Sequence, residues 1–363
     1  MTRDYSKFQL TNAQGEIAPR QPSRLEALGW QPFFAQQITI EALTETPPVR
    51  VVSVHRNSQH VVGAEIDKIL PPIANTTVGD WIMLDPNQPQ SSTVLERKSI
   101  VKRRAPGLDR KAQLIAANLE TAFIVTSCNR DFNVARLERY IALALESEIT
   151  PVIVLTKMDL VDDVDGFVAQ AQSISDLVPV VALNAKGDDV LQKLSAWCTQ
   201  GKTVAFLGSS GVGKSTLTNA LMGTDDIETQ SIREADARGR HTTTHRELHL
   251  TPSGCLVLDT PGMRELQLTD VSAGIADLFS DLDDIAKGCR FRDCLHDSEP
   301  GCAVTAAVAD GTLNADRVQR WRKLLAEEAF NNASLSERRA NDKDFGKMVR
   351  RAVKAKTKGR RHK

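Results

Sequence analysis

Residues 203–222 read TVAFLGSSGVGKSTLTNALM, and the eight residues from Gly208 to Ser215 match the pattern G-x-x-x-x-G-K-[ST] at every fixed position. A short apolar run precedes this stretch and a helix-forming run follows it, so the sequence predicts a strand, a glycine-rich loop and a helix. Glycines let a backbone wrap closely around phosphate oxygens, and amides at a helix N-terminus point at the negative charge. We expect Lys214 to reach the β- and γ-phosphates and Ser215 to bind Mg²⁺. The whole predicted phosphate site is Gly208, Ser209, Ser210, Gly211, Val212, Gly213, Lys214, Ser215 and Thr216.

A second polar motif follows at the end of another apolar run. Asp259-Thr260-Pro261-Gly262 closes the run CLVLD at residues 255–259. A carboxylate at such a strand end suits the outer shell of Mg²⁺, and the Gly262 amide can sense a γ-phosphate. Between the two motifs, residues 239–244 read GRHTTT, which suits a switch loop. One of the three threonine hydroxyls is expected to complete the Mg²⁺ shell, and we favour Thr243.

The position after Gly262 bears on hydrolysis. Ras-like enzymes carry a glutamine there to orient the attacking water, whereas this chain has Met263, whose thioether cannot do so. Either another group positions the water, or hydrolysis is slow until a partner assists. His241 is the best catalytic candidate within the chain. A structural hydrogen bond or a contact with RNA is the alternative role for this histidine.

Two further loops predict where a nucleotide base binds. Thr156-Lys157-Met158-Asp159 begins at the end of the run PVIVLT (151–156), and Asn184-Ala185-Lys186 follows the run PVVAL (179–183). The Asp159 carboxylate can accept hydrogen bonds from guanine N1–H and the exocyclic amine, whereas adenine presents an acceptor at N1 and is repelled. The stem of Lys157 can cover the base plane, and the second loop can bring a backbone amide to guanine O6. These residues indicate GTP with Mg²⁺ as the ligand.

Short apolar runs alternate with helical patterns from about residue 108. This alternation predicts an α/β fold, with a parallel sheet covered by helices on both faces. The motifs resemble those of translation-factor-related GTPases, in which the phosphate loop comes first; here the base loops precede it. A circular permutation can preserve the site, because the site depends on spatial neighbours rather than chain order. The expected strands are 121–127, 151–156, 179–183, 203–208 and 255–259, and the expected helices are 134–147 and 164–177.

Residues 48–107 show an all-β pattern. The runs VRVVSVHR, HVVGAEI and DWIMLD are β-branched or alternating and are separated by turn-forming residues. About five short strands in such a length are typical of an OB-type or an SH3-like barrel, and the pattern does not separate the two. Within residues 1–47, Leu25–Gln37 is the apolar stretch. It predicts a short helix that docks on the protein's own body or on a partner, and we favour the body.

Four potential metal ligands lie close together near the C-terminus. They follow the pattern Cys289-x₄-Cys294-x-His296-x₅-Cys302. Three thiolates and an imidazole suit tetrahedral Zn²⁺ and leave no open position, so we expect one structural zinc ion. Free thiols beside a surface histidine are the alternative. The remaining cysteines, Cys128, Cys198 and Cys255, lie in strand or helix patterns and are interpreted as core residues, and a helix is expected at Asp316–Asn331.

Charge is unevenly distributed along the chain. Lys and Arg number 46, as do Asp and Glu, yet residues 347–363 carry nine basic residues and no acidic one. A basic arm on an acidic body favours a nucleic-acid partner; a solvated tail without a partner is the alternative. The start, MTRDYSKFQL, has no apolar core of a signal peptide, and no run of about 18 apolar residues predicts a membrane span. We therefore expect a cytoplasmic monomer with reduced cysteines and no membrane partner.

Together, TKMD, GSSGVGKS, GRHTTT, DTPG and the Cys₃His ligands resemble the RsgA (YjeQ) family of circularly permuted, small-ribosomal-subunit-dependent GTPases. The resemblance spans about residues 48–335 and also points to His241 as the group that positions water. It implies late maturation of the small ribosomal subunit, contact with its rRNA, and GTP hydrolysis stimulated by that subunit. The domains expected are an N-terminal extension (1–47), an OB-type barrel (48–107), a permuted GTPase domain (108–279), a zinc-binding helical module (280–335) and a basic tail (336–363).

Two functions of different classes remain open at this stage. The first is an enzyme that converts GTP to GDP and phosphate while bound to the small subunit, and uses hydrolysis to time its release. The second is an RNA-binding protein that is regulated by GTP, with little turnover, and acts on a non-ribosomal partner. Stimulation of turnover by small subunits distinguishes them.

Overall fold

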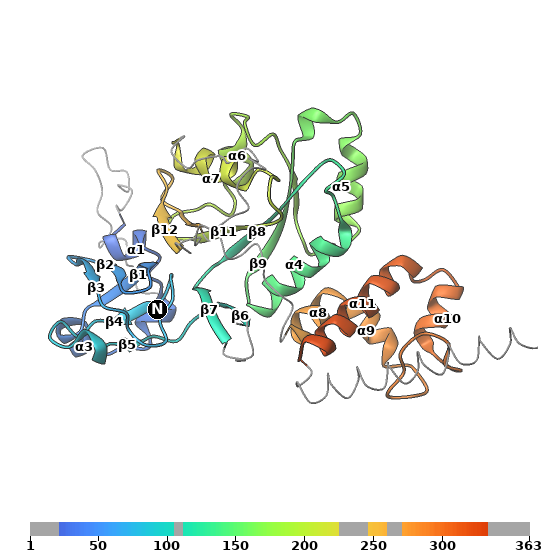
Figure 1. Ribbon diagram of the computed structural model, residues 1–363, viewed down its shortest axis with the longest axis horizontal. Helices are drawn as coiled ribbons and strands as arrows, with labels where there is room; N and C mark the ends of the chain where they lie inside the picture. The colour runs from blue at the N-terminus through green and yellow to red at the C-terminus, as the bar shows by residue number, and fades with distance from the viewer. Residues whose placement is uncertain (1–21, 105–111, 225–245, 260–270, 333–363) are drawn as a thin grey trace, which may run out of the picture.

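The computed structural model describes residues 22–104, 112–224, 246–259 and 271–332. Three regions follow one another in the chain and lie side by side in Figure 1. An N-terminal β region is blue, a central sheet with its helices runs from cyan to yellow, and a group of C-terminal helices is orange and red. The candidate site residues fall in the last two regions.

The central sheet contains the strands that the apolar runs predict. Its order is β10-β9-β8-β11-β13-β12, and the first five strands are parallel. Buried on both faces, such strands are near-continuous apolar runs, and every residue of β8 is buried. The chain visits β8, β9 and β10 before it forms β11 in the middle of the sheet. The bounds are β8 (Thr121–Ser127), β9 (Thr150–Thr156), β10 (Val180–Ala182), β11 (Thr203–Leu207), β12 (Arg246–Leu250) and β13 (Leu256–Asp259).

Helices cover both faces of this sheet, as the alternating pattern predicts. Successive residues of β8 belong to different cores: Ile124 packs into one and Phe123 into the other. The first core includes Ile141 of α4 (Val134–Glu146) and is flanked by α5 (Val164–Gln172). The second core includes Leu194 of α6 (Val190–Leu194) and Leu217 of α7 (Lys214–Met222). The predicted helix at 164–177 ends at residue 172, five residues earlier than the pattern suggests.

The strand β12 is an addition that the sequence analysis did not identify. It lies antiparallel to β13 on one side and to the first strand of the β region on the other. The register places Glu247 opposite Asp259 across one ladder and opposite Ser53 across the other. The β region and the central sheet are therefore one hydrogen-bonded, eleven-stranded system.

Five strands make up the β region, around a core that includes Val49, Val51, Val61 and Ile82. β1 pairs with both β2 and β4, β2 pairs with β3, and β4 pairs with β5. The OB-type topology stays a prediction. The bounds are β1 (Pro48–Val54), β2 (Gln59–Gly63), β3 (Asp67–Leu70), β4 (Trp81–Met83) and β5 (Thr93–Val94).

The apolar stretch 25–37 docks on the body, but it is not one helix. It forms α1 (Arg24–Ala27) and α2 (Pro32–Ala35), and α3 (Ile40–Glu45) follows. Gly29, with φ +89°, breaks the helical course, and Pro32 starts α2 at its first position, where a missing amide hydrogen costs nothing. The ring of Phe34 is buried and lies 5.9 Å from that of Trp81, which confirms docking on the protein's own β region.

A separate two-stranded sheet follows the β region. It is the antiparallel pair of β6 (Ile100–Arg104) and β7 (Ala112–Ala117). Residues 107 and 108 lie outside the described residues, between these two strands. A division of the chain at the predicted domain boundary therefore separates the two strands of one hairpin.

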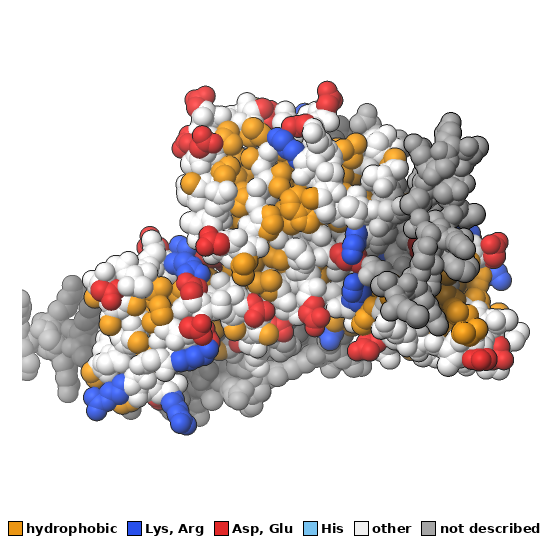
Figure 2. Space-filling view, turned by 180° about the vertical axis from the view of Figure 1, so that it is seen from behind, with side chains coloured by type: hydrophobic (Ala, Val, Ile, Leu, Met, Phe, Trp, Pro, Cys, Tyr) orange, Lys and Arg blue, Asp and Glu red, His pale blue; other side chains and the backbone are white. Residues whose placement is uncertain are grey.

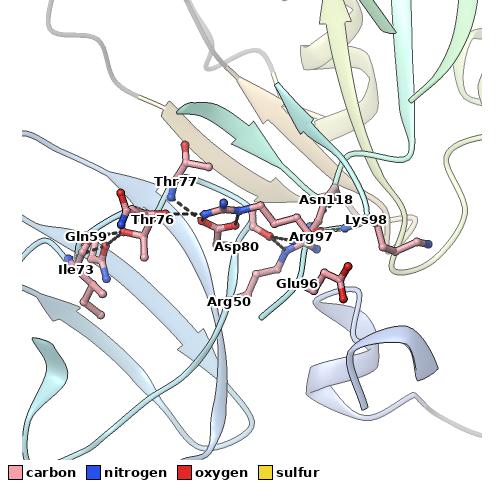
Figure 3. Close-up of polar contacts among 12 residues, drawn as sticks. Arg50, Gln59, Ile73, Thr76, Thr77, Asp80, Glu96, Arg97, Lys98 and Asn118 are labelled. Carbon is pink, nitrogen blue, oxygen red and sulfur yellow. Dashed lines mark hydrogen bonds and ion pairs between the residues drawn. The ribbon is translucent and has the colours of Figure 1, made fainter. Parts of the chain in front are cut away.

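A buried arginine joins the β region to the central sheet. Arg50 lies on β1, is 1% exposed, and donates from Nη2 to Thr203 Oγ1 at the start of β11, over 2.8 Å. It also donates to the backbone oxygens of Leu28, Gly79 and Asn118. Burial lowers the pKa of Arg50 to about 10, so the side chain stays a cation at neutral pH. Figure 3 shows this guanidinium among the polar side chains at the junction, beside the Asp80–Arg97 ion pair.

Four helices complete the described chain. They are α8 (Ser272–Leu278), α9 (Ser280–Ala286), α10 (Ala303–Ala309) and α11 (Ala315–Asn332), and the last confirms the helix expected at 316–331. The α11 helix is held against α4: Arg320 Nε donates to both carboxylate oxygens of the buried Glu138, each over 2.9 Å. Within the described ranges, every helix is too short or too polar to span a membrane.

Arg50→Met should lower the free energy of unfolding by about 2–4 kcal/mol, because several buried oxygens lose their donor together. Urea denaturation followed by circular dichroism measures the change. Arg24→Met is the matched control, since Arg24 makes an exposed ion pair with Asp67 at 3.1 Å; its loss should cost less than about 1 kcal/mol. Equal losses for the two variants would contradict a special role for the buried cation.

Candidate functional site

The predicted phosphate loop lies between the end of β11 and the start of α7. Its glycines Gly208, Gly211 and Gly213 have φ of +143°, +77° and +99°, values that favour glycine over residues with a side chain. At Gly208 there is no room for a side chain either, because a Cβ would lie 2.2 Å from the carbonyl oxygen of Val125 on β8. The loop is therefore pressed against the neighbouring strand, and the first amides of α7 follow it directly.

Lys214 crosses this loop. Its Nζ donates to the carbonyl oxygen of Gly208 over 2.8 Å and also to that of Ser209. Ser215 and Thr216 follow it in the first turn of α7. The ammonium group is thus already over the loop, where the oxygens of a phosphate can replace the two carbonyls as its partners.

The first base loop is tied to the phosphate loop. Thr156, at the end of β9, is fully buried and donates from Oγ1 to the carbonyl oxygen of Val212, over 2.7 Å. Lys157 has φ +58° and ψ +29°, an uncommon backbone conformation for a residue with a side chain. This left-handed residue turns the chain into a short 3₁₀ turn, Met158–Leu160, on which Asp159 is exposed. The sequence analysis missed the Thr156 bond, because nothing in the motif itself shows what its hydroxyl contacts.

The second base loop lies beside the other two. Asn184 Oδ1 accepts from the amide of Lys186 over 3.0 Å, and the Gly187 amide donates to the Asn184 carbonyl over 2.9 Å, so the loop is a compact turn. A Cβ built on Gly213 would lie 3.7 Å from the side chains of both Ala185 and Thr156. The three loops therefore meet at the carboxyl edge of the parallel strands, where open α/β sheets bind ligands.

The Mg²⁺ and switch residues are only partly described. Asp259 is the last residue of β13, and β13 pairs with β11 through Leu258 and Ala205, so the backbone of Asp259 lies beside the start of the phosphate loop. Gly262, His241 and Thr243 lie outside the described residues. Their predicted roles stay predictions.

Cys289, Cys294, His296 and Cys302 converge into one cluster. Their ligand atoms all lie within 4.8 Å of one another, so the cluster can hold a metal ion. Cys289 Sγ is 3.8 Å from Cys302 Sγ, and each of these sulfurs is 3.5 Å from His296 Nδ1. In a tetrahedral zinc site, bonds of about 2.3 Å to sulfur and about 2.0 Å to nitrogen give separations of about 3.8 Å and about 3.5 Å. The residues present fit such an ion.

Backbone amides favour the thiolate form at two of the three cysteines, Cys289 and Cys302. The amide of Ala303 donates to Cys289 Sγ over 3.3 Å, and that of Thr305 donates to Cys302 Sγ over 3.4 Å. Burial raises the pKa of Cys302, but the hydrogen bonds, led by that of the Thr305 amide, outweigh it and lower the pKa to about 6. The ring of His296 stacks on Trp321 of α11, with centroids 5.2 Å apart, so a metal bound to His296 would link the cluster to the long helix.

Known proteins resemble the chain over most of its length. The sequence profile of the family described as RsgA GTPase matches residues 94–269. A Vibrio parahaemolyticus protein named Small ribosomal subunit biogenesis GTPase RsgA 2 is 47% identical over 338 residues, which are 92% of this chain and 94% of that protein. A Mesorhizobium japonicum protein named Small ribosomal subunit biogenesis GTPase RsgA is 46% identical over 335 residues, or 90% of this chain and 96% of that protein.

Solved structures agree in fold. The crystal structure of YjeQ from Thermotoga maritima aligns with a TM-score of 0.56 and 27% identity, and covers 77% of this chain and 97% of that one. YloQ, described as a circularly permuted GTPase, aligns with a TM-score of 0.54 and 24% identity, over 80% of this chain and 97% of that one. The sheet order, the three converging loops and the match to the RsgA GTPase profile thus define a P-loop GTPase with permuted motif order. Within that class, the chain belongs to the RsgA GTPase family.

Purified protein should contain about one zinc ion per chain, and Cys302→Ala should lose it, because three ligands hold zinc far less tightly than four. Elemental analysis measures the metal, and amide hydrogen exchange of α10 and α11 measures the local loss of structure. Cys128→Ala is the matched control, since Cys128 is buried away from the cluster and should keep the metal. A folded wild-type protein without metal would contradict the assignment.

Proposed function

We propose that the chain is a GTPase that binds the small ribosomal subunit, acts in its late maturation, and is released when GTP is hydrolysed. The observation that carries the proposal is the 47% identity to a relative named for small ribosomal subunit biogenesis, spread over 92% of this chain. An identity of that extent covers the β region, the permuted GTPase core and the metal module together. The proposed partner is thus the one for which the relatives are named.

In this proposal the three loops have separate tasks. The P-loop residues 208–216 bind the phosphates, Asp159 selects guanine over adenine, and residues 184–186 complete the base site. The Thr156–Val212 bond supports this division, because it fixes the base loop relative to the phosphate loop at 2.7 Å. Mg²⁺ would be held by Ser215 and Thr243, with Asp259 in its outer shell, and it would neutralise charge on the phosphates. His241 would position the attacking water.

The four ligands of the cluster would hold one structural zinc ion, and the C-terminal helices would form a module around it at residues 280–335. Contact with rRNA is assigned to the β region at 48–107, to this module, and to the basic tail within 336–363, while residues 1–47 are an N-terminal extension. On the face shown in Figure 2, Lys and Arg side chains are interspersed with Asp and Glu. The basic tail, with nine Lys and Arg and no acidic residue at 347–363, is proposed to supply much of the electrostatic attraction to RNA. A cytoplasmic monomer is part of the same proposal.

Asp159→Asn should weaken GTP binding and strengthen XTP binding, because the C2 carbonyl of xanthine can accept a hydrogen bond from the new amide. A loss of one bidentate contact to guanine predicts a change of roughly tenfold or more in the ratio of the two dissociation constants. Titration with both nucleotides measures it. Asp162→Asn, three residues further along the chain, is the matched control and should leave the ratio unchanged. An unchanged ratio in Asp159→Asn would show that the base binds elsewhere.

GTP turnover should rise well above its basal rate when purified 30S particles are added, and co-sedimentation should be stronger with a non-hydrolysable GTP analogue than with GDP. Both follow if hydrolysis times release. Lys214→Ala should abolish turnover under either condition, because it removes the charge that faces the phosphates. RNA binding with unchanged turnover on adding 30S particles would instead favour a GTP-regulated RNA-binding protein with a non-ribosomal partner.

A further inference from the structure

Arg136 connects the first turn of α4 to the phosphate loop. Its Nη1 donates to Ser209 Oγ over 2.8 Å, between residues 73 positions apart in the sequence. The backbone of Arg136 is fixed as well, because its amide donates to Oδ1 of Asn133, the N-cap of the helix, over 3.0 Å. The guanidinium therefore projects from the beginning of a helix whose start is defined by a capping bond.

The helix that carries Arg136 is firmly held. Two residues beyond it, Glu138 is fully buried and pairs with Arg320 of α11 through both carboxylate oxygens. Arg139 pairs with Glu327 of the same helix over 2.5 Å. Leu137 and Ile141 pack into the core below. Because α4 is fixed by this packing and by two ion pairs, Arg136 has a rigid base from which to hold the loop.

Ser209 has two different contacts. Its carbonyl oxygen accepts from Lys214 Nζ, and its hydroxyl oxygen accepts from Arg136. The first contact would be lost if Lys214 turned to a bound phosphate. The second contact does not involve Lys214, so it can be kept when Lys214 turns to the phosphate. Ser209 would then keep its contact with Arg136 after losing its contact with Lys214.

We propose that Arg136 is a positioning residue for nucleotide binding, which acts through Ser209 to hold the first half of the phosphate loop in its binding conformation. The inference rests on the proposed function of residues 208–216 as the phosphate site. Arg136 touches the loop rather than the reacting atoms, so its contribution should be the same in the ground state and the transition state. Uniform stabilisation of this kind changes KM and leaves kcat unaltered.

The test compares Arg136→Ala, Ser209→Ala and the double variant. Each single change should raise the dissociation constants for GTP and GDP by about threefold to tenfold, the range expected for one lost hydrogen bond at an exposed site. The double variant should be no worse than either single one, because both remove the same contact. Titration with fluorescent GDP and GTP analogues gives the affinities, and steady-state turnover should show a raised KM with kcat within about twofold of the wild type.

Arg139→Ala is the matched control. It lies three residues further along the same helix and loses an ion pair to α11 instead of a contact to the loop. It should lower thermal stability without changing nucleotide affinity, so a general loosening of α4 is distinguished from the loss of the loop contact. Additive losses of nucleotide affinity in the double variant, or a fall in kcat with unchanged affinity, would overturn the positioning role of Arg136 and leave the proposed function standing. Failure of the wild-type protein to bind either nucleotide would overturn the proposed function and this inference with it.

Discussion

The buried guanidinium of Arg50 is the interaction on which the arrangement of the chain most depends. A cation without water must have its donors satisfied by the protein, and Arg50 finds acceptors in four separate parts of the chain: the end of α1, the loop before β4, the turn before β8 and the first residue of β11. Desolvation would make an incomplete set of partners expensive. The requirement therefore holds these segments together at one point, and β11 leads from that point directly to the phosphate loop.

The permuted order of the motifs has little effect on the site itself. Base loops from β9 and β10 and the phosphate loop from β11 meet because their strands end at the same edge of one parallel sheet. The order in which these strands occur along the chain does not affect the convergence of the loops. Close packing then fixes the details: the carbonyl of Val125 excludes any side chain at Gly208, and the Thr156 hydroxyl reaches Val212. The same sheet edge could be built from several chain orders.

Much of this could be predicted from the sequence where burial is continuous. The run 121–127 is buried at every position, and its predicted and observed bounds agree. Patterns failed where burial is partial. The sequence of β12 is RELHL, in which polar and apolar residues alternate too weakly to predict a strand. Most residues of β3 are exposed. Long-range side-chain partners could not be predicted either, since the bond from Arg50 to Thr203 joins residues 153 positions apart. The convergence of the three cysteines and His296 was predicted because all four lie within one short segment, whereas the roles of His241, Thr243 and Gly262 remain predictions.

The pairing of β12 with β1 has a consequence for the sheet as a physical object. An open sheet exposes unpaired amides and carbonyls along its outermost strand, and such an edge can recruit strands from other molecules. β1 covers part of that edge with its own backbone at Ser53 and Val54. Removing the β region, so that the GTPase core stands alone, would uncover β12 and leave it as an exposed edge strand with unpaired backbone groups. The β region thus also covers part of an edge that would otherwise be open to pairing with other strands, independently of anything that it binds.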